Sequence, residues 1–110
     1  MAALRYASRG VVLLFEERNI RVLAAATVAV IAAGFLFRLA AIEWCVIIFA
    51  IALVWTAEAL NTALERLTDL ASPEFHPLAG KAKDMAAGAV LLAVAGAVSI
   101  GLVIFGQRLF

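Results

Sequence analysis

Four polar side chains recur at intervals of three and four residues within an apolar part of the chain. They are Glu58, Asn61, Glu65 and Asp69, called the polar stripe below. On a helix of 3.6 residues per turn, this spacing gathers them along one face. A carboxylate inside a membrane helix costs about 2.5 kcal/mol or more to insert. The pattern therefore favours a functional role over a purely structural one, although Asn61 alone would be typical of a hydrogen bond between helices.

Further acids and bases are expected at the membrane depth of the polar stripe. Carboxylates without a His or Cys cluster suit a hard cation such as Mg²⁺, and a nearby lysine suits a polyphosphate. Oxygen ligands, a basic residue and a spare carboxylate are what phosphoryl transfer requires. The chain has no P-loop and no kinase Gly-rich loop. A proton-coupled transporter using Glu58 or Glu65 therefore stays almost as well supported as a kinase. The additional charged residues are Glu16, Glu17, Lys83 and Asp84.

The composition indicates that lipid is the solvent of this chain. Of its 110 residues, 66% are hydrophobic and 15% charged, and the mean hydropathy is +1.08. A membrane-spanning helix needs about 20 mostly apolar residues, so the length allows three spans and one short surface segment. The net charge of +1 does not suggest a nucleic-acid partner. We therefore expect an all-α membrane protein.

The polar stripe is expected in the second half of the second of three spans. Charged and apolar residues are interleaved from about 3 to 18, which is typical of an amphipathic helix on the membrane surface. Spans are expected at about 22–39, 42–70 and 81–105, with a loop rich in helix breakers before the third. Small residues in the third span, among them Gly88 and Gly96, would permit close helix packing.

The basic residues predict the orientation, because Lys and Arg concentrate on the cytoplasmic side of membrane proteins. Arg38 and Arg108 fall on one side, where Arg38 and Glu43 are expected to be solvated or paired caps. The N-terminus and the loop before the third span are expected to face the cytoplasm. The basic residues on that side are Arg5, Arg9, Arg18, Arg21, Arg66, Lys81 and Lys83.

Two strings carry a resemblance to a known family. EALNTALERLTDL at 58–70 and HPLAGKAKDMAAGAVLL at 76–92 combine E-x-x-N-x-x-x-E with K-x-K-D, and they resemble the small prokaryotic diacylglycerol kinase and undecaprenol kinase family. ERN at 17–19 and IEW at 42–44 extend the resemblance over nearly the whole chain. The resemblance implies a single membrane lipid-kinase domain over residues 1–110. It also implies a homotrimer in a bacterial cytoplasmic membrane that uses Mg-ATP to phosphorylate a lipid alcohol.

The resemblance further implies roles for individual residues. Glu58 matches the general base that takes the proton from the lipid hydroxyl, and Glu17 and Glu65 match the Mg²⁺ ligands. Asn61 would support them, and Asp69 would have either a supporting or a structural role. The SPEFHP and IEW segments favour undecaprenol as the substrate, with diacylglycerol as the alternative. The residues implied in nucleotide binding are Tyr6, Glu17, Glu65, Glu74, Phe75, His76, Lys83 and Asp84.

Overall fold

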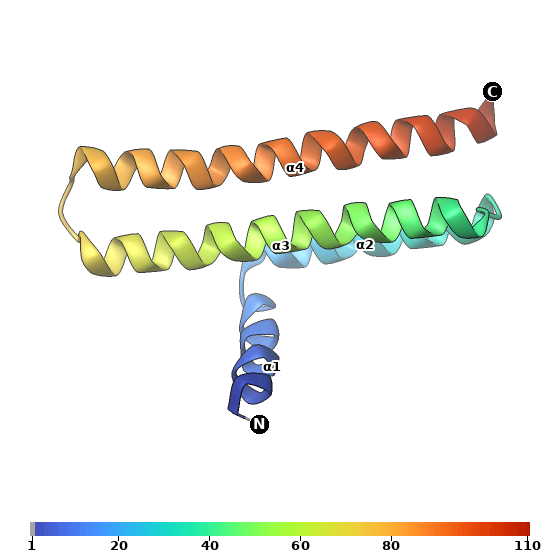
Figure 1. Ribbon diagram of the computed structural model, residues 1–110. Coiled ribbons are helices and arrows are strands. Elements are labelled where there is room, and N and C mark those ends of the chain that lie inside the picture. Colours follow the sequence, from blue (N-terminus) through green and yellow to red (C-terminus); the bar gives the residue numbers. More distant parts are fainter. Residues whose placement is uncertain (1) are drawn as a thin grey trace. The chain divides into compact units, whose positions relative to one another are not determined.

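The computed structural model describes residues 2–110, and every regular element in that range is a helix (Figure 1). The helices are α1 (Ala2–Leu14), α2 (Arg18–Leu36), α3 (Ala41–Ala71) and α4 (Pro77–Leu109). By length and composition, α2, α3 and α4 are each able to cross a membrane, whereas α1 has 13 residues. The predicted architecture of three spans and a short N-terminal helix is confirmed.

The chain divides into two compact units, Met1–Leu36 and Phe37–Phe110. In the first unit, α1 ends before the expected boundary near residue 18. The N–H groups of Phe15, Glu16 and Glu17 each donate to the carbonyl three residues earlier, at 3.0–3.1 Å, which tightens the chain into a turn. Glu17 therefore lies in the bend between α1 and α2 rather than within the surface helix.

The turn between α2 and α3 begins earlier than the sequence suggested. We expected the first span to reach about residue 39 with Arg38 inside it. Arg38 instead has a φ of 54°, in the left-handed region, which is incompatible with a continuing right-handed helix. Helix α2 accordingly ends at Leu36, and Arg38 belongs to the turn.

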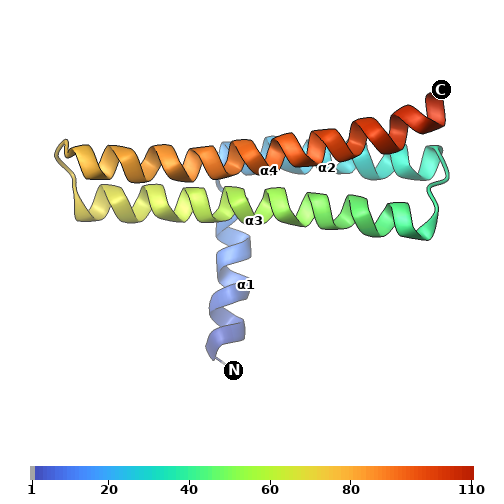
Figure 2. The same cartoon turned by 45° about the horizontal axis from the view of Figure 1, so that its top comes forward.

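The second unit is a pair of antiparallel helices, α3 and α4, that lie side by side in both views (Figures 1 and 2). Their buried residues are few and mostly small or β-branched. An added Cβ at Gly88 or Gly96 would meet no atom of this unit within 4 Å, so these glycines are not where α4 approaches α3. Alanines fill that role. The buried residues of the pair are Ile47, Ala50 and Val54 of α3, and Ala86, Ala93 and Ile104 of α4.

The connection between α3 and α4 is short because both helices are capped closely. The N–H of Ser72 donates to the Thr68 carbonyl at 2.8 Å where α3 ends. His76 is the N-cap of α4, and its Nδ1 accepts a hydrogen bond from the Leu78 N–H at 3.1 Å. Pro77 follows in the first helical position, where its missing N–H costs nothing. Helix α4 therefore begins at Pro77 and not near residue 81.

Candidate functional site

The polar stripe lies on one continuous helix, α3, as its spacing predicted. Glu58 and Asn61 are half-buried, whereas Glu65 and Asp69 are exposed. One turn apart, the Asn61 Nδ2 donates to the Glu65 Oε1 at 3.2 Å. Among the described residues, the Glu58 carboxylate has no hydrogen-bond or ion-pair partner. The stripe thus contains one carboxylate that is held by an amide and another that is available to accept a proton.

An apolar groove between α3 and α4 adjoins the stripe. Its volume is about 500 Å³, and Thr56 and Asn61 are its polar lining residues. The Asn61 Oδ1 is buried and has no hydrogen-bond partner among the described residues. A buried acceptor without a donor is costly, so it is a place where a ligand or another chain could add a hydrogen bond. The groove is lined by Leu53, Thr56, Ala57, Leu60, Asn61, Leu64, Ala86, Ala89, Leu92 and Ala93.

Lys83 of α4 joins the stripe across the helix pair. Its Nζ lies 2.5 Å from the Asp69 Oδ1, forming an ion pair between the two helices near their connection. The Lys83 side chain is 41% exposed and that of Asp69 is 64% exposed. The fold therefore brings a flexible ammonium group to the acidic face of α3, at a position open to solvent.

The other predicted site residues are less closely gathered. Glu74, Phe75 and His76 are exposed in the connection, and Asp84 is exposed on α4. Phe75 is 92% exposed, which leaves its ring available for stacking. Glu74 accepts a hydrogen bond from the Ser72 hydroxyl through its carbonyl, at 3.0 Å, so its carboxylate is not used there.

Tyr6 and Glu17 belong to the first unit, Met1–Leu36. The Arg9 guanidinium lies over the Tyr6 ring, 5.8 Å from its centroid, a cation–π contact on α1. Glu17 is half-buried in the bend that follows. That Tyr6 and Glu17 share a nucleotide site with the polar stripe stays a prediction.

A Mg²⁺ site would be built from few protein ligands. Among the described residues, no group of three or more His, Cys, Asp or Glu side chains is close enough to hold a metal ion. Mg²⁺ commonly uses one or two carboxylates together with phosphate oxygens and water. The donor chemistry of Glu17 and Glu65 therefore fits an ion that arrives with a nucleotide, rather than one held by the protein alone.

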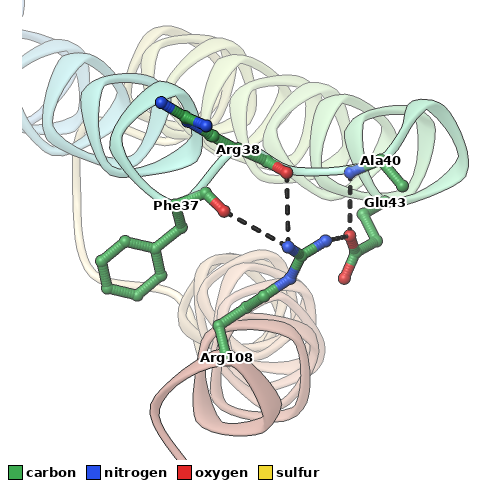
Figure 3. A network of polar contacts seen from close by, with 5 residues as sticks. All are labelled: Phe37, Arg38, Ala40, Glu43 and Arg108. Carbon is green, nitrogen blue, oxygen red and sulfur yellow. Dashed lines mark hydrogen bonds and ion pairs between the residues drawn. The ribbon is translucent and has the colours of Figure 1, made fainter.

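A second polar cluster, which the sequence did not reveal, lies at the opposite end of the helix pair (Figure 3). The Arg108 guanidinium donates to the carbonyls of Phe37 and Arg38, each at 3.3 Å, and forms an ion pair with Glu43. The Ala40 N–H also donates to the Glu43 Oε1, at 2.9 Å. We call this set the Arg108 network. Glu43 was expected to be a solvated or paired cap, and the paired form is confirmed, although its partner Arg108, 65 residues away, left no local signal in the sequence.

Comparison with known proteins gives a consistent result. The family model for prokaryotic diacylglycerol kinase matches residues 5–105. An undecaprenol kinase from Bacillus subtilis is 46% identical over 93 residues, which cover 84% of this chain and 76% of the relative. A diacylglycerol kinase from Synechocystis is 46% identical over 103 residues, covering 92% of this chain and 59% of the relative. A diacylglycerol kinase from Escherichia coli is 43% identical over 58 residues, covering 53% of this chain and 48% of the relative.

Proposed function

This chain belongs to the prokaryotic diacylglycerol kinase family and is a membrane lipid kinase, and we propose that it transfers the γ-phosphoryl group of ATP to the hydroxyl of undecaprenol. The observation that carries the proposal is the ion pair between Lys83 and Asp69. It brings a phosphate-binding type of side chain on α4 to the acidic face of α3. Family membership also favours a kinase over the proton-coupled transporter considered from the residues alone.

Glu58 is the proposed general base. Its carboxylate takes the proton of the lipid hydroxyl, the hydroxyl oxygen forms a bond to the γ-phosphorus, and ADP leaves with the electron pair of the broken bond. Two features support this role. The side chain is half-buried, and no hydrogen bond or ion pair within the described residues occupies its carboxylate. A base of this kind needs an unoccupied oxygen within hydrogen-bond reach of the substrate.

The nucleotide is proposed to bind across α3, α4 and their connection. The Lys83 ammonium group would neutralise phosphate charge, and Asp84 would contact the nucleotide beside it. Asn61 would hold Glu65 in place through their 3.2 Å hydrogen bond, while Asp69 would hold the Lys83 ammonium group until phosphate displaces it. The remaining proposed nucleotide contacts are Tyr6, Glu74, Phe75 and His76.

Mg²⁺ is the proposed metal, with Glu17 and Glu65 as its protein ligands. When bound with ATP, it would supply charge neutralisation at the phosphates. Both residues offer carboxylate oxygens, which this hard cation prefers. Their part is to bind and orient the nucleotide complex, whereas the proton is assigned to Glu58.

The proposed assembly is a homotrimer of single-domain subunits in a bacterial cytoplasmic membrane, with the N-terminus in the cytoplasm. The distribution of Lys and Arg supports this orientation. Many large apolar side chains of the spans are exposed within one chain, among them Phe49, Leu92 and Leu102. The unpartnered Asn61 Oδ1 also leaves an acceptor for a ligand or a second copy. Lipid and neighbouring subunits would cover these surfaces.

The identity of the lipid substrate is the most specific part of the proposal. The apolar groove can accept many chains, so discrimination is expected at the level of the headgroup, where a primary alcohol and a glycerol diester differ. The undecaprenol kinase from Bacillus subtilis and the SPEFHP and IEW segments support undecaprenol.

Competition between lipids tests the proposal. Purified protein in micelles is given radiolabelled ATP, Mg²⁺ and equal amounts of undecaprenol and diacylglycerol. We expect phosphoryl transfer to either lipid to require Mg²⁺, and we expect a higher kcat/KM for undecaprenol than for diacylglycerol. A preference for diacylglycerol would overturn the lipid assignment alone. Absence of transfer to either lipid by folded protein would overturn the proposed reaction.

A further inference from the structure

The α3–α4 pair is joined by polar side-chain contacts at both of its ends, and its buried residues between those ends are apolar. The buried contact surface consists mainly of small or β-branched residues, such as Ala50, Ala86 and Ala93. Small side chains allow close approach but form shallow ridges and grooves. The directional contacts at the two ends can therefore add to what the apolar surface does to set the register of α4 along α3.

The contact near the connection is poorly suited to fixing the register of α4 against α3 during turnover. Lys83 and Asp69 make a single ion pair, and both side chains are substantially exposed. Under the proposed function, the Lys83 ammonium group also binds phosphate. Its contact with Asp69 must then be shared or broken whenever ATP binds.

The Arg108 network has the opposite character. One guanidinium contacts two backbone carbonyls and one carboxylate, and that carboxylate is held in turn by the Ala40 N–H (Figure 3). The Arg108 and Glu43 side chains are 34% and 19% exposed. The Phe37 and Phe105 rings add an edge-to-face contact, with centroids 5.3 Å apart. Backbone acceptors cannot change rotamer, so this end holds α4 at a fixed position.

We propose that Arg108 and Glu43 are positioning residues that fix the register of α4 against α3 and so hold Lys83 opposite the polar stripe, with Asp84 next to it in the chain. The proposal rests on the proposed function, because it assumes that ATP is bound from both helices. A helix transmits an axial displacement along its length, here over roughly 38 Å from Arg108 to Lys83. Misplacement of a binding group by about 1 Å can cost on the order of 100-fold in rate.

The experiment measures the KM for ATP and kcat in the full-length protein, with undecaprenol and diacylglycerol offered separately. The variants are Arg108→Gln, Glu43→Gln and both together. We expect each single change to raise the KM for ATP about three- to tenfold and to lower kcat, since both α3 and α4 contribute to the nucleotide site. The double variant should be no worse than the more affected single variant, because either change breaks the same network.

The KM distinguishes positioning from a loss of folded protein. Fewer folded molecules would lower the maximal rate and leave the KM for ATP unchanged, and that outcome would overturn the proposal. Additive effects in the double variant would also overturn it. If Arg108→Gln does not fold, Arg108→Lys keeps the charge without the planar fork, and the same rise in KM is expected.

Arg38→Gln is the matched control. It removes one positive charge at the same end of the pair, but the Arg38 side chain points away from Glu43 and only its carbonyl joins the network (Figure 3). Its KM for ATP should equal that of the wild type. If the KM rises as much as in the Arg108→Gln variant, the effect comes from the lost charge and not from the network. An inactive wild type would overturn the proposed function, whereas an active wild type with unaffected Arg108 and Glu43 variants would overturn this inference alone.

Discussion

The two ends of the α3–α4 pair use polar residues in different ways. In the half of the pair that leads to the connection, Lys83 and Asp69 form an exposed pair, the Glu58 carboxylate has no hydrogen bond or ion pair among the described residues, and the Asn61 Oδ1 lacks a donor. At the other end, Arg108 and Glu43 are bound to each other and to the backbone. Unsatisfied polar groups reduce stability, so they are retained where a substrate can use them. Satisfied networks are retained where geometry must be held.

This difference predicts two kinds of variant. Changes at the polar stripe should affect chemistry or nucleotide binding without lowering the thermal stability of the protein. Changes in the Arg108 network should lower thermal stability as well as alter the KM for ATP.

Glu58→Gln is expected to have the largest effect. If its carboxylate is the general base, kcat should fall by about 10²- to 10⁴-fold while Mg-ATP affinity stays unchanged, because proton transfer occurs only in the transition state. The melting temperature should not fall, since an unpaired carboxylate in a span is replaced by a neutral amide. Turnover in micelles, equilibrium nucleotide binding and thermal denaturation measure the three quantities. Retained turnover would remove Glu58 from the role of base.

Glu65→Gln and Glu17→Gln are expected to have the next largest effect. Loss of a metal-ligand carboxylate should weaken Mg-ATP binding by roughly 10- to 100-fold and reduce turnover as well, because the ligand acts in both the ground state and the transition state. Titration of Mg-ATP at several Mg²⁺ concentrations measures the change. Glu16→Gln is the matched control, as it removes a neighbouring carboxylate without a proposed ligand role. Equal losses of Mg-ATP affinity in the Glu58, Glu65 and Glu17 variants would show that the roles are assigned wrongly.

Thermal stability compares the two ends directly. Arg108→Gln should lower the melting temperature by more than Lys83→Gln, because Arg108 donates to two carbonyls and a carboxylate whereas Lys83 makes one exposed ion pair. Thermal denaturation of both variants in the same detergent measures the difference. High salt should reduce the effect of Lys83→Gln further. A larger loss from Lys83→Gln would reverse the comparison.

The sequence predicted those features of the fold that depend on local periodicity. The spacing of Glu58, Asn61 and Glu65 placed them on one helix face, and hydropathy found three spans. Helix ends were less accurate, because they depend on single conformations such as the positive φ of Arg38 and the N-cap of His76. These features involve only a few residues each and leave the hydrophobic pattern unchanged.

The tertiary parts of the site could not be obtained from periodicity. Arg108 lies in the last turn of α4 and Glu43 in the first turn of α3. Their ion pair can be seen only once the register of α4 on α3 is known. The unsatisfied Asn61 Oδ1 similarly depends on which atoms surround it. The proposed roles of Glu58 and Glu17 came from family resemblance, and they stay predictions.

Asp69→Asn is expected to have the smallest effect. Unlike the other changes, it should strengthen Mg-ATP binding rather than weaken it. Without nucleotide, the Asp69 carboxylate is the partner of the Lys83 ammonium group at 2.5 Å. Incoming phosphates must compete with it, and Asn keeps the shape of the side chain while removing the charge. Because the pair is exposed, the Kd for Mg-ATP should fall by only about two- to fivefold. The gain should shrink as salt is raised.

Lys83 provides the control that decides the meaning of this result. Lys83→Gln alone should weaken Mg-ATP binding, and in the Lys83→Gln, Asp69→Asn double variant the gain should vanish because no ammonium group remains to be released. Nucleotide titrations of the four proteins form a complete cycle. Weaker binding in Asp69→Asn would mean that Asp69 orients Lys83 towards phosphate instead of competing with it. The exposed end would then resemble the Arg108 end in function, and the distinction between an adaptable and a fixed end of the helix pair would fail.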